Sequence, residues 1–182
     1  MRKVMLLVIT VFMLTTLFST GVDAATKTTK KPVVGKLEGA VTYQYNKFIG
    51  TKADVGAVVY LIPKKQKKAS ITTQQMIDIS DKKIKANSVG IYYTKVNGKG
   101  DYKISGIPEG DYIILIISLN TTRDFLTKYD DKAATKLLKP YFKDWNNLST
   151  GMLEAFKSVA EEITITGNDT TDYSHDFGYS YL

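Results

Sequence analysis

The feature that most constrains the fold is a stretch of alternating apolar residues, 100–118, interrupted by glycine and proline near its middle. Before the interruption, Tyr102 and Ile104 alternate with polar residues, which is the two-residue period of one sheet face. From 112–117 every residue is apolar, so both faces of that segment are expected to be buried. Glycines on either side of Pro108 favour a chain reversal. The sequence therefore predicts two strands joined by a tight turn, with the second strand central in a sandwich.

The same stretch carries a family resemblance. The pattern G-x-Y-x-I-x-G-I-P-x-G-x-Y-x-I-x-I over residues 100–116 resembles the middle hairpin of carboxypeptidase regulatory-like domains, also called transthyretin-like or prealbumin-like. The segments GKLEGAV at 35–41 and VGAVVYL at 55–61 are similar to two further strands of that family. The resemblance covers about residues 33–62 and 91–118 and implies a mainly β fold, a seven-stranded Ig/prealbumin-like β-sandwich. It implies little about function, because such domains are grafted onto many secreted proteins.

Residues 1–24 have the three parts of a secretory signal peptide. Arg2 and Lys3 form a basic start, an apolar run follows, and small residues around Ala24 form a cleavage site. The apolar run is shorter than the roughly 20 residues that a membrane span needs, and no second apolar span follows. Residues 25–32 are expected to form a flexible linker. We therefore expect a secreted or cell-surface protein with no membrane span after leader cleavage.

Composition narrows the possible partners of the remaining domain, residues 33–182. The chain has no cysteine, which excludes disulfides, a thiolate nucleophile and cysteine-based metal sites. Its formal net charge is +7, with both signs interspersed along the sequence. The dense basic run KKQKK at 64–68 is expected to be a solvated loop, whereas nucleic-acid binding needs a concentrated basic face. Nucleic acid is therefore not an expected partner.

A helical insertion is expected at about residues 121–160, where apolar residues recur at the helical period instead of the strand period. Thr121 is a candidate N-cap for its first helix. Pro140 is expected to open a second segment as a first-turn residue or to kink the first helix. A third short helix, capped by Ser149 or Thr150, is expected to reach Val159.

Other turns and caps complete the expected order of elements. Thr72 or Thr73 is a candidate N-cap for a short helix inside the polar segment 64–90. An Asn-Gly pair at 97–98 predicts a hairpin turn into the stretch that begins at residue 100. The strand period returns after the insertion and continues to the end of the chain, which gives about seven strands in all.

The residues give little support for catalysis. The single histidine, His175, lies between Ser174 and Asp176, but neighbours on a strand point to opposite faces and cannot form a triad. One histidine and no cysteine leave too few ligands for a zinc site. The acidic residues within 169–176 match no calcium loop, and turns are rich in such residues. Sandwich hydrolases of the resembling family use His and Arg clusters, whereas Arg123 is the one arginine beyond the leader. We expect no enzyme activity, no cofactor and no metal.

Tyr141 and Trp145 are the candidate ligand-binding residues, because aromatic rings in a long insertion can stack on sugars. The alternative for both is that they pack the helices onto a sheet. We interpret the chain as an exported non-catalytic binding or adhesion module of the cell envelope, with carbohydrate or a cell-envelope protein as its partner. The alternative is a structural or accessory domain that docks a protein partner. A hydrolase built on the sandwich is a third hypothesis, which the lone histidine disfavours.

We expect the secreted product to begin at Ala25, because Val22 and Ala24 occupy the two small-residue positions of the cleavage site. Intact-mass measurement of the exported protein checks this. A mass that retains residues 1–24 would contradict the interpretation as a released, exported protein.

Overall fold

The domain Pro32–Leu182 is described over residues 32–124 and 128–179 in a computed structural model. The expected signal peptide, 1–24, and nearly all of the expected linker, 25–32, lie outside the described residues. The strands are β1 (Val34–Asn46), β2 (Gly50–Ala53), β3 (Val58–Pro63), β4 (Tyr92–Lys95), β5 (Asp101–Pro108), β6 (Gly110–Thr122), β7 (Phe156–Ile165), β8 (Thr170–Asp172) and β9 (His175–Tyr179). The helical segments are α1 (Thr73–Ser80), η1 (Ala86–Val89), α2 (Lys132–Leu138), η2 (Lys139–Tyr141), α3 (Trp145–Asn147) and η3 (Leu148–Leu153).

Two sheets form a sandwich-like arrangement, and the chain is mainly β. The first sheet is organised by the long strand β1, which pairs antiparallel with β5 and β2 and parallel with β8 and β9. The second sheet has the order β4-β3-β6-β7, with antiparallel neighbours throughout. The expected β-sandwich is therefore confirmed, with nine strands among the described residues instead of about seven, because β2 and the split between β8 and β9 were not anticipated.

The centre of the second sheet is β6, which is buried on both faces as its sequence predicts. Ile114 and Ile116 belong to the apolar core between the two sheets. Ile113 and Leu115 belong to a second core, between the outer face of this sheet and the helical segments. The alternation of a β-strand sends successive side chains to opposite faces, so one strand supplies both cores. The layers are therefore sheet, sheet and helices.

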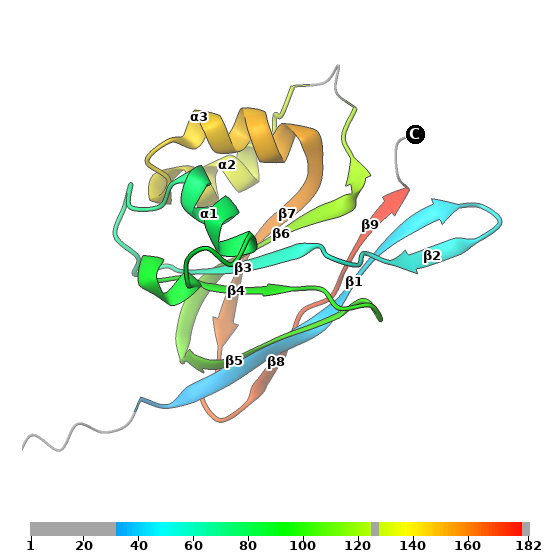
Figure 1. Cartoon of the computed structure of the whole chain (residues 1–182). Helices are drawn as coiled ribbons and strands as arrows, with labels where there is room; N and C mark the ends of the chain where they lie inside the picture. Colours follow the sequence, from blue (N-terminus) through cyan, green and yellow to red (C-terminus); the bar gives the residue numbers. More distant parts are fainter. Residues whose placement is uncertain (1–31, 125–127, 180–182) are drawn as a thin grey trace, which may run out of the picture. The chain divides into compact units, whose positions relative to one another are not determined.

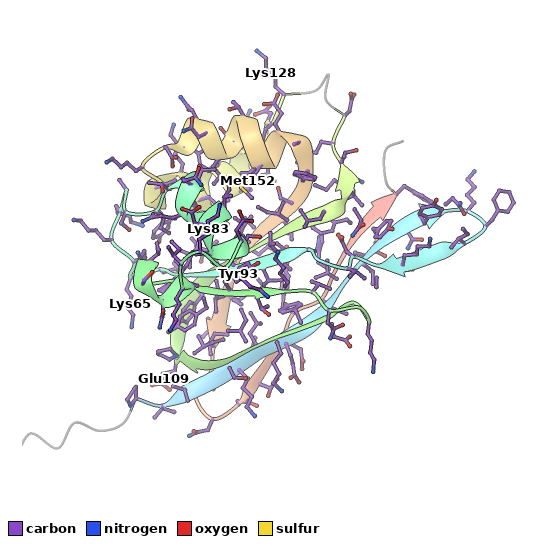
Figure 2. The ribbon with its side chains drawn as sticks, in the orientation of Figure 1. Lys65, Lys83, Tyr93, Glu109, Lys128 and Met152 are labelled. Atoms are coloured by element: carbon purple, nitrogen blue, oxygen red, sulfur yellow. The ribbon has the colours of Figure 1, made fainter. Side chains whose placement is uncertain are left out.

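The helical segments cover one face of the β4-β3-β6-β7 sheet (Figure 1). The N-cap of α1 is Thr72, whose side chain accepts from the Gln75 N–H while the Gln75 side chain accepts from the Thr72 N–H. This capping box confirms one of the two N-caps expected from the sequence. Tyr93 of β4 and Met152 of η3, both labelled in Figure 2, pack against the core between the helical segments and the sheet. No helix in the described part of the chain is long and apolar enough to cross a bilayer.

The expected hairpin of residues 100–118 is wrong in its pairing. β5 bonds to β1, whereas β6 bonds to β3 and β7 in the other sheet. The turn with Pro108 therefore carries the chain from one sheet to the other instead of folding two strands against each other. β5 has one apolar face, which suits the β1 sheet, because only one side of that sheet is covered. β6 has two apolar faces and needs a position that is covered on both sides. The sequence period indicates how many faces are buried, but it does not say which strands pair.

The turn at Asn97 is a second sheet-to-sheet connection, and the expected Asn-Gly hairpin is also wrong. Asn97 Oδ1 accepts from the N–H groups of Lys99 and Asp101, so the turn is held by a side chain. β4, before the turn, pairs with β3, while β5, after it, pairs with β1. A turn occurs where it is expected, but its residue with positive φ is Gly100 and not Asn97 or Gly98, and tertiary packing decides the strand partners.

The insertion is shorter than expected, because β6 extends to Thr122 and β7 begins at Phe156. Thr121 is a buried strand residue, and the first helix is instead capped by Asp131, whose side chain accepts from the Ala134 N–H. Pro140 lies in the first turn of η2, which confirms that it opens a second helical segment instead of kinking the first. The third helix does not reach Val159, which pairs with Ile116 in the sheet, and Ser149 and Thr150 lie inside η3 instead of capping it.

We expect Ile114→Asp to unfold the domain, because it buries a charge with no partner between the two sheets, at a cost of roughly 4 kcal/mol or more. Ile114 is fully buried. The matched control is Leu119→Asp, on the same strand but 45% exposed, which should change the free energy of unfolding by less than about 1 kcal/mol. Urea denaturation of both variants measures the difference. A wild-type melt for Ile114→Asp would show that β6 is not the central strand.

Candidate functional site

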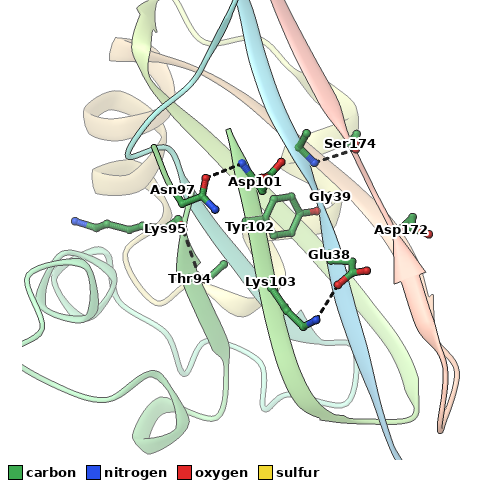
Figure 3. Close-up of a pocket in the computed structure, with 11 residues that line it drawn as sticks. Glu38, Gly39, Thr94, Lys95, Asn97, Asp101, Tyr102, Lys103, Asp172 and Ser174 are labelled. Atoms are coloured by element: carbon green, nitrogen blue, oxygen red, sulfur yellow. Dashed lines mark hydrogen bonds and ion pairs between the residues drawn. The ribbon is translucent and has the colours of Figure 1, made fainter. Parts of the chain in front are cut away.

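An open groove of about 670 Å³ lies over β1 and β5, and we call it the β1–β5 groove (Figure 3). It is lined by Glu38, Gly39, Ala40, Thr94, Lys95, Asn97, Asp101, Tyr102, Lys103, Asp172 and Ser174. These residues come from β1, β5, the end of β4 and the segment around β8. Its volume falls in the usual range for small-ligand sites.

The floor of the groove is set by the antiparallel register of β1 and β5. Glu38 lies opposite Lys103, and Ala40 lies opposite Asp101. The Lys103 Nζ is 3.0 Å from Glu38 Oε2, with both side chains about half exposed. An exposed ion pair of this kind contributes about 0–1 kcal/mol to stability. The ion pair between Glu38 and Lys103 can therefore open, and each side chain can bind a ligand, at little cost to the stability of the fold.

One wall of the groove is fixed by close contact between β1 and the segment before β9. A Cβ atom at Gly39 would lie 1.8 Å from the carbonyl oxygen of Tyr173, so this approach requires glycine. The Tyr102 hydroxyl donates to the same carbonyl at 2.5 Å, and burial raises the pKa of Tyr102 above its ordinary range. The Ala40 N–H donates to Ser174 Oγ at 2.9 Å. These contacts hold the wall rigidly against β1.

The groove presents hydrogen-bonding groups of every common kind. Carboxylates come from Glu38, Asp101 and Asp172, and ammonium groups come from Lys95 and Lys103. Asn97, Thr94 and Ser174 add an amide and two hydroxyls. The single lining ring, Tyr102, is 3% exposed and offers no face for stacking. The groove is therefore suited to a ligand with many hydroxyl groups and slightly disfavours anions.

The Ser174-His175-Asp176 sequence does not form a catalytic arrangement, because each side chain has a different setting. The Ser174 hydroxyl accepts from the Ala40 N–H, and the Asp176 carboxylate accepts from Gln44 Nε2 and the Gly178 N–H. His175 packs edge-on against Phe177 with ring centroids 4.5 Å apart. Burial lowers the pKa of His175, while the nearby carboxylates Glu161 and Asp176 oppose this.

Metal-binding geometry is not found among residues 32–124 and 128–179. In that part of the chain, no three His, Cys, Asp or Glu side chains come together as ligands. The acidic residues that were considered as calcium ligands lie in separate places and have different partners. Asp169 accepts from the Thr170 N–H, Asp172 lines the groove, and Asp176 is bonded as described above.

The two residues expected to bind a ligand, Tyr141 and Trp145, lie in the helical layer and not in the groove. Tyr141 is 4% exposed, and its hydroxyl donates to the Lys64 carbonyl at 3.0 Å. The Lys68 Nζ lies 3.6 Å from the Tyr141 ring centroid. Trp145 is partly buried against the helix-side core, 6.5 Å from the Tyr129 ring. Of these two candidate residues, only Trp145 is partly exposed to solvent.

Sequence reasoning missed the β1–β5 groove because its residues come from four separate segments. Their polar side chains look like the ordinary solvent face of alternating strands. Gly39 is the one signal that the sequence carried, since a glycine inside a strand often marks a close backbone approach.

Several solved structures resemble this chain at low sequence identity. No protein-family model and no curated protein matches this sequence. Among solved structures, a minor pilin of Streptococcus agalactiae is 15% identical with a TM-score of 0.40, covering 83% of this chain and 47% of the pilin. A candidate carbohydrate-binding protein of Pseudomonas aeruginosa is 12% identical with a TM-score of 0.41, covering 82% and 92% of the two chains. The Bacillus anthracis TIE protein is 11% identical with a TM-score of 0.38, covering 80% and 16%. At these TM-scores the likenesses carry no argument about function.

We expect Trp145→Ala to lower the free energy of unfolding by about 1–3 kcal/mol, less than the 3–5 kcal/mol typical of a fully buried tryptophan. The partly open ring should also give intermediate acrylamide quenching of its fluorescence. The control is Asn146→Ala at the exposed neighbouring position, which should change stability by less than about 0.5 kcal/mol. Unchanged stability with strong quenching of Trp145 would mean that the ring lies free on the surface.

Proposed function

We propose that this chain is an exported, non-catalytic binding module of the cell envelope and that its β1–β5 groove binds carbohydrate. The observation that carries the proposal is the mixture of donors and acceptors on paired strands, with Glu38 opposite Lys103 and Ala40 opposite Asp101. Each sugar hydroxyl both donates and accepts, and such a ligand uses carboxylates, amides and ammonium groups together.

The electrostatics of the groove favour some sugars over others. The lining contains three carboxylates and two lysines, one of which is paired with Glu38, so a neutral or amino sugar suits the groove better than an acidic one. Because Tyr102 is buried, the groove contributes hydrogen bonds but no stacking, and binding should be weak for a single sugar unit. Several sugar units or several copies of the module would be needed for firm attachment.

Trp145 supplies a second, separate way in which the same function could be carried out. Its partly open ring lies in the helical layer, where a sugar could stack on it. Variants distinguish the two surfaces. Binding in the groove would depend on its charged side chains, whereas binding at Trp145 would depend on its aromatic ring.

The test is a glycan array with the mature chain, followed by NMR titration of the best-bound oligosaccharide. We expect Glu38→Gln with Asp101→Asn to weaken binding roughly tenfold or more, because a hydrogen bond to a charged group contributes about 1.5–3 kcal/mol. Chemical-shift changes should map to β1 and β5.

The matched control is Glu162→Gln, which alters a similar exposed ion pair, 2.8 Å from Lys64, in the other sheet. It should leave glycan binding unchanged. Loss of binding in Trp145→Ala but not in the groove variant would move the site to the helical layer. Absence of binding to every glycan on the array would overturn the carbohydrate proposal.

A further inference from the structure

The turn between β1 and β2 ends in two adjacent apolar side chains that nothing in the described domain covers. Phe48 is 98% exposed and Ile49 is 56% exposed. Residues at the tips of hairpin loops are usually small or polar. The β1–β2 hairpin also extends away from the helical layer in Figure 1. We call residues 46–49 the hairpin tip.

The hairpin tip is built and held in place by hydrogen bonds. Asn46 Oδ1 accepts from the N–H groups of Phe48 at 2.9 Å and Ile49 at 2.7 Å. Gly50 follows in a left-handed conformation with φ of 74°, which lets the chain turn back into β2. The two apolar side chains are therefore presented by an ordered turn.

Aromatic and cationic residues surround the base of the tip. Tyr45 is 39% exposed, and the Lys52 Nζ lies 3.8 Å from its ring centroid. Tyr179 of β9, which is 55% exposed, lies opposite Gln44 of β1. Lys47 is exposed at the turn itself. The end of the hairpin thus carries the apolar pair with Lys47 beside it, and Tyr45, Lys52 and Tyr179 lie nearer its base.

The tip lacks negative charge of its own. Residues 43–53 contain two lysines and no aspartate or glutamate. The next acidic residue along the chain, Asp54, is fully buried, and its Oδ1 accepts from Asn120 Nδ2 at 2.6 Å. On β9, Asp176 lies opposite Thr42, further from the tip, and its carboxylate accepts from Gln44 and Gly178.

We infer that the hairpin tip is an interfacial anchor for an anionic phospholipid bilayer. Phe48 and Ile49 would enter the boundary between headgroups and acyl chains, where exposed apolar side chains are stabilised. Tyr45 and Tyr179 would lie at the headgroup level, which tyrosine favours. Lys47 and Lys52 would meet the anionic lipid phosphates.

The chemistry of the tip favours a membrane over a protein as its partner. Lysine is depleted at the centres of protein interfaces, whereas two lysines flank this apolar pair. A projecting pair of side chains also inserts into a fluid boundary without needing a matching pocket. The inference does not depend on carbohydrate binding, because the groove lies elsewhere on β1. From Glu38 to Asn46 the strand spans about 26 Å, so a membrane at the tip leaves the groove open.

The test is cosedimentation of the mature chain with vesicles of phosphatidylcholine alone or mixed in equal parts with phosphatidylglycerol. We expect binding to the mixed vesicles that weakens as salt is added. Phe48→Ser with Ile49→Ser should reduce that binding about tenfold or more. Lys47→Gln with Lys52→Gln should remove the preference for phosphatidylglycerol.

The matched control is Ile77→Gln, which removes a 37% exposed apolar side chain on α1, away from the hairpin. It should bind the mixed vesicles like the wild type. A second measurement uses Phe48→Trp with brominated lipids, which should quench the emission of the indole introduced at the tip. The wild type, whose emission comes from Trp145 in the helical layer, should show no quenching by the same lipids.

Two results would overturn the inference. One is equal vesicle binding, or equal absence of binding, in the wild type and the Phe48→Ser, Ile49→Ser variant, with circular dichroism showing both folded. The other is a wild-type dimer in sedimentation velocity that this variant abolishes without any vesicle binding, since that would assign the tip to a second copy of the chain. Neither outcome bears on glycan binding by the groove.

Discussion

Ile114 and Ile116 of β6 face one core while Ile113 and Leu115 face another, and this two-sided burial determines the layers of the domain. Burial of apolar surface stabilises the folded state by roughly 25 cal/mol per Å². Neither of the two apolar faces of β6 can therefore be left exposed to water. The β1 sheet covers one face. The helical segments between β6 and β7, together with α1, cover the other. A sandwich of this size therefore needs its helices as part of the core.

The position of β6 leaves the outer face of the β1 sheet as a polar surface open to solvent. Leu37 and Val41 point into the inter-sheet core, so the side chains between them point outward. Glu38 and Ala40 occupy that outward face and form the floor of the groove. Changes there alter surface chemistry without opening the core, which suits a scaffold whose binding surface varies while its fold stays constant.

The sequence predicted which faces are buried better than it predicted which strands pair. The alternation around Tyr102 and the apolar run at 112–117 identified β5 and β6 correctly, because side-chain period follows directly from backbone geometry. Their partners depend on contacts far along the chain, which a local pattern does not contain. The same limit explains Val159, where apolar spacing fits both a helix and a strand and pairing with β6 decides.

The candidate sites were harder to predict for a related reason. Tyr141 and Trp145 were singled out because aromatic residues stand out in a sequence, and packing then placed Tyr141 almost wholly inside. The groove joins β1, β4, β5 and the segment around β8 through ordinary polar residues, and none of these residues is unusual alone. Phe48 is unusual only in its exposure, which cannot be known before the turn at Asn46 is seen.

The groove and the hairpin tip lie on β1 and can offer a partner only side chains, and the pairing of β1 explains why. Lys36 pairs with β5 on one edge and with β8 on the other, and Thr42 pairs likewise with β2 and β9. A ligand strand therefore cannot add to β1 by backbone hydrogen bonds, as it can at a free sheet edge. At the tip, Asn46 already satisfies the backbone N–H groups of Phe48 and Ile49. What β1 can offer a partner is thus limited to its outward side chains, which are polar over the groove and apolar at the tip.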